Sequence, residues 1–492
     1  MPRLQPEERG RLLDDLAHMG SQGRAERESV DTFKKTFYPV PEHSRAFDPD
    51  VVLIIGERGS GKSELFRAVV SEGLLPAIIR AAVSSRLAKL DPGHIDWLAG
   101  HPLDKDFPDH AGLRRFLSDH AADSEAVIAL WFAYLVRVLG NKVSRDPFGS
   151  STFFDLPGGD VGTIVRTFRG LENVPLLALD ELDKKLERQD HWVFVSYDEL
   201  DILGAYDWNA MARSIEGLVS FWANYSRRWS RIRAKIFLRT DLFRRHAQVL
   251  GADLIRLAAN RAEIFWSDRN LYAMLVKRIA NTSEELRQYC EVAGLRLEPD
   301  QLLGLEPKLD RAEDAQPLIE RMVGAYMGAD IKKGRTLAWL LSHVRDGNGR
   351  AMPRALVRLI EESARQEQNK PRATYNRLLD PRSLRRALDE VSKEHVLEVN
   401  THELPWLPGV AERLQGEGVP MPRLSAERLL GHRWDDNWGK GPKIRPPVET
   451  PYALVDYLVE IGVFRVRTKG KLDVPDLFLA GLGLTRKGGV KK

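Results

Sequence analysis

Eight consecutive residues near the start of the chain have the types and spacing of a phosphate-binding loop. They fit the pattern GxxxxGK[ST], and they are Gly56, Glu57, Arg58, Gly59, Ser60, Gly61, Lys62 and Ser63. The glycines allow positive φ, so that successive backbone N–H groups can point at phosphates. Lys62 supplies a positive charge for the β- and γ-phosphates, and the Ser63 hydroxyl can bind Mg²⁺. The pattern predicts a site for ATP and Mg²⁺.

A strand and a helix must hold this loop in place. Residues 51–55 are an apolar, β-branched run, which is typical of a buried parallel strand. Residues 64–70, beginning with Glu64, predict a helix whose positive N-terminal end adds to anion binding. The order strand, loop, helix is the context that the motif requires, and it predicts an α/β fold with a parallel sheet.

A carboxylate is also needed to hold Mg²⁺, and two Asp-Glu pairs are available. Leucines three and four residues apart surround Asp180 and Glu181, which predicts an amphipathic helix. Residues 192–197 are aromatic and β-branched, so Asp198 and Glu199 follow a strand. Ligands of open α/β sheets bind at the carboxyl ends of the strands. We therefore expect the second pair, and not the first, to lie in the site.

The second pair also indicates the type of reaction. We expect Asp198 to bind Mg²⁺ through water and Glu199 to polarise the attacking water. A kinase that transfers the phosphoryl group to a bound acceptor needs to exclude water. The glutamate therefore favours a Mg²⁺-dependent hydrolase over a metabolic kinase.

A third strand, 235–238, ends in Arg239, Thr240 and Asp241. A polar residue at its end would face the γ-phosphate from between the two earlier strands, and either Arg239 or Thr240 could do so. Alternatively, Arg239 pairs with a nearby acid. The surrounding segment 225–245 is rich in Lys and Arg. It could contact nucleic acid or a neighbouring subunit's nucleotide, or it could form a solvated helix face.

The next segment resembles a helical lid, with apolar residues at helical spacing in 266–279. Just before it, Arg256 or Arg261 could act as an arginine finger in the site of an adjacent protomer. Further on, Arg354 follows Pro353 in the first turn of a predicted helix. The helix dipole does not favour a positive charge there, which suggests that Arg354 has an anionic partner.

Together these motifs resemble the AAA+ and STAND ATPases, over roughly residues 31–366. The layout is similar to that of the origin-recognition type initiators and of predicted bacterial P-loop ATPases of mobile and defence islands. The resemblance implies that Lys62 and Ser63 form Walker A and that Asp198 and Glu199 form Walker B. It further implies that Arg239 or Thr240 is sensor 1 and that Arg354 is sensor 2.

One departure from this family is the long separation of Ser63 from Asp198. We expect a helical insertion at about 68–171 and no second strand within it. The strand order, and hence the choice between AAA+ and STAND, stays open. The expected fold is a three-layer α/β P-loop NTPase core of the ASCE type, with this insertion, an α-helical lid and a C-terminal winged-helix-like domain.

The domain boundaries follow from changes in composition. We expect a mobile N-terminal segment at 1–30, the ATPase core at 31–265, the lid at 266–366, and a connector with the winged-helix-like domain at 367–492. In the last part, 405–447 is rich in Pro, Gly and Trp and predicts an irregular connector. A helix at 452–461 and two short strands around a basic turn then give a winged-helix outline, which could bind DNA or dock a protein.

Composition sets wider limits. The 492 residues carry a net charge of only +4, so overall charge does not indicate a nucleic-acid partner. Cys290 is the single cysteine, which excludes an internal disulfide and is typical of a reducing cytoplasm. The longest apolar run, 126–136, is shorter than the roughly 20 residues that span a bilayer and predicts a buried helix. We expect a cytoplasmic protein without membrane contact.

Two functional classes remain open. In the first, a homo-oligomeric ATPase couples hydrolysis to action on double-stranded DNA or on a partner protein. In the second, a slow nucleotide-gated switch recruits or restrains a protein effector without direct action on DNA. The resemblance in layout extends either class to bacterial antiviral defence.

Overall fold

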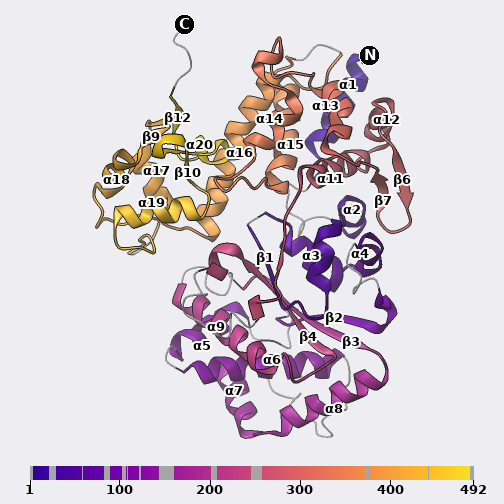
Figure 1. Ribbon diagram of the computed structural model, residues 1–492, viewed down its shortest axis with the longest axis vertical. Helices are drawn as coiled ribbons and strands as arrows, with labels where there is room; N and C mark the ends of the chain where they lie inside the picture. Colours follow the sequence, from indigo (N-terminus) through magenta and orange to yellow (C-terminus); the bar gives the residue numbers. More distant parts are fainter. Residues whose placement is uncertain are drawn as a thin grey trace. The chain divides into compact units, whose positions relative to one another are not determined.

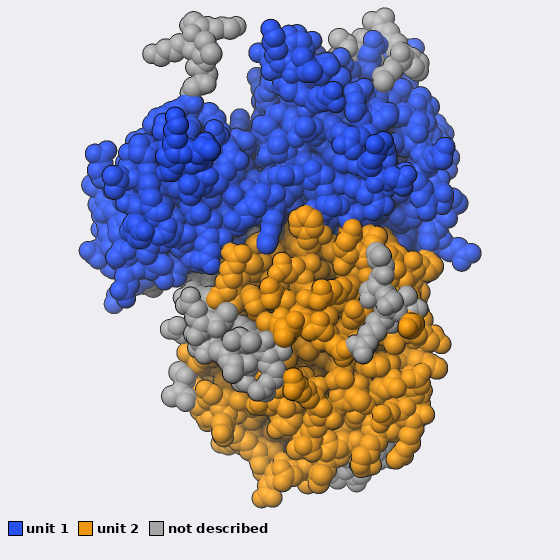
Figure 2. All heavy atoms as spheres, viewed as in Figure 1, with its two compact units in different colours: residues 1–38, 266–492 blue, residues 39–265 orange. Residues whose placement is uncertain are grey.

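The computed structural model divides the chain into two compact units (Figures 1 and 2). One unit comprises residues 39–265, and the other comprises 1–38 with 266–492. The structure describes residues 4–20, 29–57, 59–82, 89–101, 107, 109–120, 123–142, 160–200, 208–244, 257–372, 376–441 and 443–487. Among these residues, no helix is both long enough and apolar enough to cross a bilayer.

The unit of residues 39–265 is built on a five-stranded parallel sheet. Its strands are β1 (Leu53–Gly56), β2 (Ile95–Ala99), β3 (Trp192–Tyr197), β4 (Ile232–Arg239) and β5 (Ala262–Glu263). Their order across the sheet is β2-β3-β4-β1-β5, with every pair parallel. Strand β4 therefore lies between β1 and β3, as the sequence predicted. The sequence also predicted β1, β3 and β4 close to their observed positions.

Helices cover both faces of this sheet (Figure 1). On one face, Tyr197 of β3 packs 5.7 Å from the ring of Trp131. On the other face, Phe194 of the same strand stacks on Trp97 at 4.6 Å. Alternate residues of a strand point to opposite sides, so both faces of β3 are buried and the unit has three layers.

The helices of this unit separate into two groups by the face that they cover. Aromatic contacts and buried residues place one group against the Phe194 face, namely α3 (Lys62–Val70), the 3₁₀ helix η2 (Pro41–Phe47) and α4 (Leu75–Ala81). The other group shares the core with Tyr197, and its members are α5 (His110–Asp119), α6 (Ser124–Lys142), α7 (Val161–Gly170), α8 (Val174–Arg188) and α9 (Trp208–Tyr225). The apolar run 126–136 lies in α6, which confirms the predicted buried helix.

The expectation of a purely helical insertion at 68–171 is wrong, because this segment contains β2. Strand β2 is the edge of the sheet, and it pairs with β3 from Ile95 to Ala99. Only Trp97 of its five residues is buried. An edge strand needs an apolar side chain only where it meets the core, so its sequence has no continuous apolar run.

The other unit begins with α1 (Pro6–Ala17), which packs on α15 (Pro353–Asn369). Arg9 forms a buried ion pair with Glu367 at 2.9 Å and also donates to the carbonyl of Leu378. The expectation of a mobile segment at 1–30 is therefore wrong for residues 4–20. Residues 21–28 lie outside the described part of the chain.

Several further helices and a hairpin complete the first half of this unit. They are α2 (Val30–Thr36), α11 (Asp268–Ala280), α12 (Glu284–Val292), β6 (Leu297–Asp300), β7 (Gly304–Pro307), α13 (Gln316–Met322) and α14 (Thr336–His343). Helix α11 corresponds to the apolar pattern at 266–279. Pro353 occupies the first turn of α15, as predicted.

The second half contains α16 (Pro381–His402), α17 (Leu407–Leu414), β8 (Gly418–Val419), β9 (Met421–Pro422), α18 (Arg423–Gly431), α19 (Pro451–Glu460), β10 (Arg465–Val466), β11 (Lys471–Asp473), α20 (Asp476–Leu479) and β12 (Thr485–Arg486). The strands pair in the orders β10-β11-β9 and β12-β8. The predicted helix and hairpin correspond to α19, β10 and β11. The segment 405–447 contains α17 and α18, so the expectation of an irregular connector is wrong.

Candidate functional site

The phosphate-binding loop has the backbone shape that its sequence predicted. Gly59 and Gly61 have φ of 70° and 93°, and Gly61 is the N-cap of α3. A Cβ atom at Gly56 would lie 2.5 Å from Ser60 Oγ, so only glycine fits where the loop leaves β1. This tight turn into a helix N-terminus fits the phosphates of a nucleotide. Arg58 lies outside the described residues.

The Lys62 ammonium is held inside the loop. Its Nζ donates to the carbonyls of Gly56 at 2.9 Å and Glu57 at 3.0 Å. Ser63 and Glu64 follow in the first turn of α3, and both are half-buried. The donor set of loop backbone, lysine and serine hydroxyl therefore fits ATP with Mg²⁺.

The predicted acidic pair follows β3 at the same edge of the sheet as the loop. Gly56, the last residue of β1, is paired in register with Arg239, the last residue of β4, and β3 is the next strand. Asp198 is half-buried and Glu199 is exposed. Glu199 has φ of 56°, which costs a non-glycine residue about 1 kcal/mol. Strain of this kind is common at functional sites.

The other acidic pair, Asp180 and Glu181, lies on helix α8 as predicted. Arg228 donates to both oxygens of Asp180, at 2.7 and 2.6 Å, and these bonds hold the pKa of Asp180 below its usual value. One turn on, Asp183 accepts from the backbone N–H of Ile232, where β4 begins. The acids of this helix therefore hold the amino end of β4, at the edge of the sheet opposite the phosphate-binding loop.

At the end of β4, Arg239 is paired with Asp241. Arg239 Nε lies 3.0 Å from Asp241 Oδ1, and its Nη2 lies 2.6 Å from Oδ2. Burial by itself raises the pKa of a carboxyl group, but Arg239 and the Lys62 ammonium hold the pKa of Asp241 below its usual value. Thr240, between them, is buried. Sequence reasoning assigned no role to Asp241, although its spacing two residues after a strand-ending arginine was a usable signal.

Most described cations of the basic segment 225–245 are engaged within their own unit. Arg231 pairs with Asp190 at 2.8 Å, and Arg233 donates to the carbonyls of Ser226 and Trp229. Lys235 is fully buried on the Phe194 face and donates to the carbonyls of Asp48 and Val51. These residues lie on a turn and on β4, so the interpretation as a solvated helix face is wrong.

Of the two arginines predicted as fingers, the structure describes only Arg261. Arg261 is part-exposed, with its Nε 3.3 Å from Glu263, and its guanidinium lies 5.6 Å from the Phe243 ring centroid. The surface ion pair is weak, so Arg261 remains accessible to a second subunit. Arg256 lies outside the described residues.

Arg354 lies in the first turn of α15, as predicted, and its nearby anion is Glu398 of α16. Arg354 Nη1 is 3.7 Å from Glu398 Oε2. The other oxygen of Glu398 accepts from Arg358 at 2.6 Å. An anionic partner for Arg354 was expected, and one is present within its own unit.

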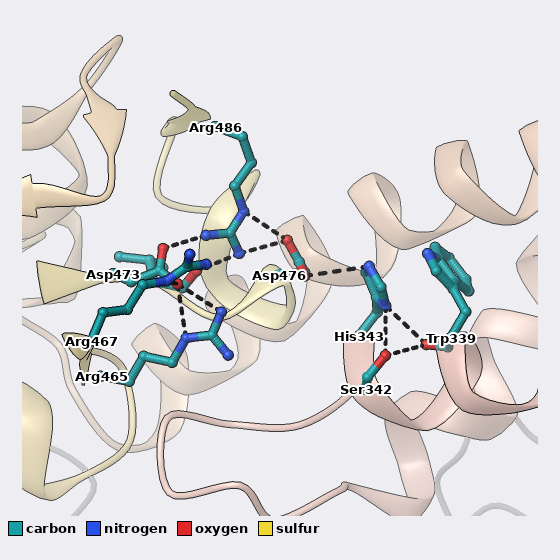
Figure 3. Close-up of polar contacts among 9 residues, drawn as sticks. Trp339, Ser342, His343, Arg465, Arg467, Asp473, Asp476 and Arg486 are labelled. Carbon is teal, nitrogen blue, oxygen red and sulfur yellow. Dashed lines mark hydrogen bonds and ion pairs between the residues drawn. The ribbon is translucent and has the colours of Figure 1, made fainter. Parts of the chain in front are cut away.

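The basic hairpin of β10 and β11 carries an internal counter-charge (Figure 3). Asp473 is fully buried and accepts from Arg465, Arg467 and Arg486. Arg486 also pairs with Asp476 at 2.7 Å, and Asp476 lies 3.7 Å from His343 of α14 (Figure 3). The guanidinium groups are therefore fixed in position and partly neutralised.

Comparisons with known proteins give only distant likeness. No family profile matches the chain, and no curated protein matches its sequence. Among solved structures, the ORC2 protein of Aeropyrum pernix, in its ADPNP-ADP complexes, is 15% identical over 88% of this chain and 86% of its own, with a TM-score of 0.36. A Walker-type ATPase of Pyrococcus abyssi is 14% identical over 91% and 99%, also with a TM-score of 0.36. Likeness at this level carries no argument on function, which rests on the residues of the site.

Proposed function

We propose that this chain is a Mg²⁺-dependent ATPase. The observation that carries the proposal is the arrangement at the carboxyl edge of the parallel sheet. There the loop from Gly56 to Ser63 enters α3, next to the end of β4, with Asp198 and Glu199 after the following strand. Loops at this edge are where open α/β sheets bind their ligands.

Each residue of the proposed site has a role that follows from its chemistry. The backbone of the loop and Lys62 bind the phosphates, and the positive end of α3 adds to this attraction. Ser63 and Asp198 would hold Mg²⁺, which neutralises charge on the β- and γ-phosphate oxygens when it is bound. Glu199, exposed and held at positive φ, orients and polarises the attacking water.

Cations around the terminal phosphate complete the proposed site. Arg239 or Thr240 would contact it from the end of β4, and Arg354 from the first turn of α15. In a homo-oligomer, Arg261 or Arg256 of one protomer would reach the nucleotide of the next. Membership of the AAA+ or STAND group, the helical lid and the winged-helix-like domain remain predictions.

The two functional classes predict different roles for the hairpin of β10 and β11. In the first, hydrolysis is coupled to double-stranded DNA or to a partner protein. In the second, the protein is a nucleotide-gated switch that acts through a protein effector. The engagement of Arg465, Arg467 and Arg486 by acids of their own unit favours the second, because it reduces the charge available to a DNA backbone. A role in antiviral defence remains a prediction of the resemblance.

Steady-state ATP hydrolysis, measured against protein concentration with and without double-stranded DNA, tests the proposal. Glu199→Gln serves as the blank. A rate per chain that rises with concentration and with DNA supports a DNA-coupled oligomer. A low rate that depends on neither supports the switch, and no rate above the blank contradicts the ATPase.

A further inference from the structure

Asp241, two residues after the last residue of β4, makes a two-point contact with Arg239. Its two carboxylate oxygens accept from Nε and Nη2 of Arg239, at 3.0 and 2.6 Å. The Arg239 side chain is 9% exposed and that of Asp241 is 16% exposed. A two-point contact of this kind fixes the plane of a guanidinium group as well as its position.

The same carboxylate lies near the loop lysine. Lys62 Nζ donates to the carbonyl of Gly56, and Gly56 is the register partner of Arg239. The ammonium of Lys62 also contributes to the lowered pKa of Asp241. Asp241 therefore contacts one of the two cations that the proposed function places near the terminal phosphate, and the other is bonded to the register partner of that same arginine.

We propose that Asp241 is a positioning residue, whose carboxylate fixes the Arg239 guanidinium at the end of β4, on the strand next to the phosphate-binding loop. This inference rests on the proposed function, because it assigns a role within that site. It builds on the alternative stated from the sequence, that Arg239 pairs with a nearby acid. An arginine side chain has many rotamers, so holding it in one of them before the nucleotide binds lowers the entropy cost of using its charge.

The position of Asp241 gives its loss a distinctive signature. The carboxylate repels the phosphates of a nucleotide, while its effect on Arg239 assists the transfer step. In Asp241→Asn we expect kcat to fall roughly 10²-fold, as for the loss of one preorganised donor, because Arg239 loses its two-point contact with the carboxylate. We expect affinity for a methylanthraniloyl-ATP probe to stay equal or to rise about two- to fivefold, because one negative charge is removed.

A matched control is present at the opposite edge of the sheet. Asp180 accepts from Nε and Nη2 of Arg228 in the same two-point geometry, at 2.7 and 2.6 Å. Asp180→Asn breaks an equivalent pair in the same unit, away from the loop. We expect it to leave kcat and probe affinity within about twofold of wild type.

The test measures kcat, probe affinity and Tm for the full chain and four variants. The variants are Asp241→Asn, Arg239→Gln, their double variant and Asp180→Asn, with Lys62→Ala as the binding blank. Because Asp241 acts through Arg239, the double variant should lose no more kcat than Arg239→Gln alone. A fall in kcat with retained affinity, absent from Asp180→Asn, supports the proposal.

Two kinds of result would overturn the proposal for Asp241, and both can be told apart from a failure of the ATPase proposal. If Asp241→Asn hydrolyses ATP like wild type, or loses affinity, turnover and Tm together, Asp241 is not a positioning residue. In either case wild type still binds the probe and Lys62→Ala does not, so the ATPase proposal is retained. If wild type and Lys62→Ala bind the probe equally, both proposals are wrong.

Discussion

The guanidinium of Arg354 lies 3.7 Å from the carboxylate of Glu398, which joins the first turn of α15 to the C-terminal part of α16. Glu398 is largely buried, and its second oxygen accepts from Arg358. The arginine that we propose to contact the nucleotide therefore already has an anionic neighbour. If Arg354 contacts the nucleotide as proposed, a phosphate competes with Glu398 for it.

The first prediction concerns this competition. In Glu398→Gln we expect ATP to bind about fivefold more tightly, which corresponds to the roughly 1 kcal/mol that a part-exposed ion pair contributes. The reason is that Arg354 no longer has to leave a carboxylate. The measurement is probe affinity, and the gain should vanish when Arg354→Ala is added.

Glu394 provides the control, since it lies one turn earlier on α16 and approaches Arg358 at 3.8 Å while being 61% exposed. Glu394→Gln removes the same charge from the same helix but leaves the Arg354–Glu398 contact in place. We expect its affinity to match that of wild type. An equal gain in both variants would mean that general charge, and not Arg354, sets the affinity.

The second prediction separates binding from turnover. Lys62→Ala should weaken ATP binding at least tenfold, because the loop loses its side-chain cation at the phosphates. Glu199→Gln should bind ATP like wild type while kcat falls roughly 10²- to 10⁴-fold, since only activation of water is lost. Binding is measured with the fluorescent probe and turnover by phosphate release. Unchanged turnover in Glu199→Gln would place the base at another residue.

The third prediction concerns Asp183, which belongs to the acidic helix that we exclude from the site. Asp183 is buried and accepts from the backbone N–H groups of Ser230, Arg231 and Ile232. Asp183→Ala leaves these donors without their acceptor, and we expect a loss of about 3 kcal/mol in the free energy of unfolding. We expect kcat per folded molecule to be unchanged.

Glu181→Ala is the comparison for Asp183→Ala. Glu181 lies on the same helix, is 69% exposed and pairs only with Lys184 among the contacts that the structure describes for it. Its loss should change the free energy of unfolding by less than about 0.5 kcal/mol. Denaturant unfolding and steady-state hydrolysis measure the two quantities. If Asp183→Ala is fully folded and its kcat is nevertheless lower, then helix α8 does belong to the active site.

The parts of the fold that were predictable from sequence are those with local patterns. Residues 192–197 were predicted as a strand, and β3 has these bounds, because both faces of a central strand are buried and its apolar run is continuous. The turn at Gly59 and Gly61 was predictable because only glycine adopts positive φ cheaply. Strand β2 was missed because an edge strand buries little.

The parts that were not predictable depend on partners far away in sequence. Nothing near Arg354 indicates that its neighbour is Glu398, and nothing near Arg9 indicates Glu367. The position of Asp180 on a helix was predictable, but its ion pair with Arg228 was not. Such contacts form only when the helices pack, so a one-dimensional pattern does not contain them.

The last prediction uses a buried acid on α15. Glu361 is fully buried and accepts from the N–H of Gly20, and burial raises its pKa to about 7. The usual value is 4.5, so between pH 4.5 and about 7 the folded chain binds a proton that the unfolded chain does not. The free energy of unfolding should therefore rise as the pH falls from about 7 to 4.5, by up to about 3 kcal/mol from this group.

Glu361→Gln tests this, because the amide keeps an oxygen for Gly20 and carries no charge. We expect the variant to be more stable than wild type at pH 8, and the difference to disappear near pH 5. Glu362→Gln, next along α15 and paired with Arg365 in a part-exposed contact, should show no such pH-dependent gain. Denaturant unfolding at the two pH values measures the difference. An equal gain in the free energy of unfolding at both pH values would mean that Glu361 is not the group that titrates. A lower free energy of unfolding for Glu361→Gln than for wild type at pH 8 would mean that the arginines around Glu361 stabilise its charge.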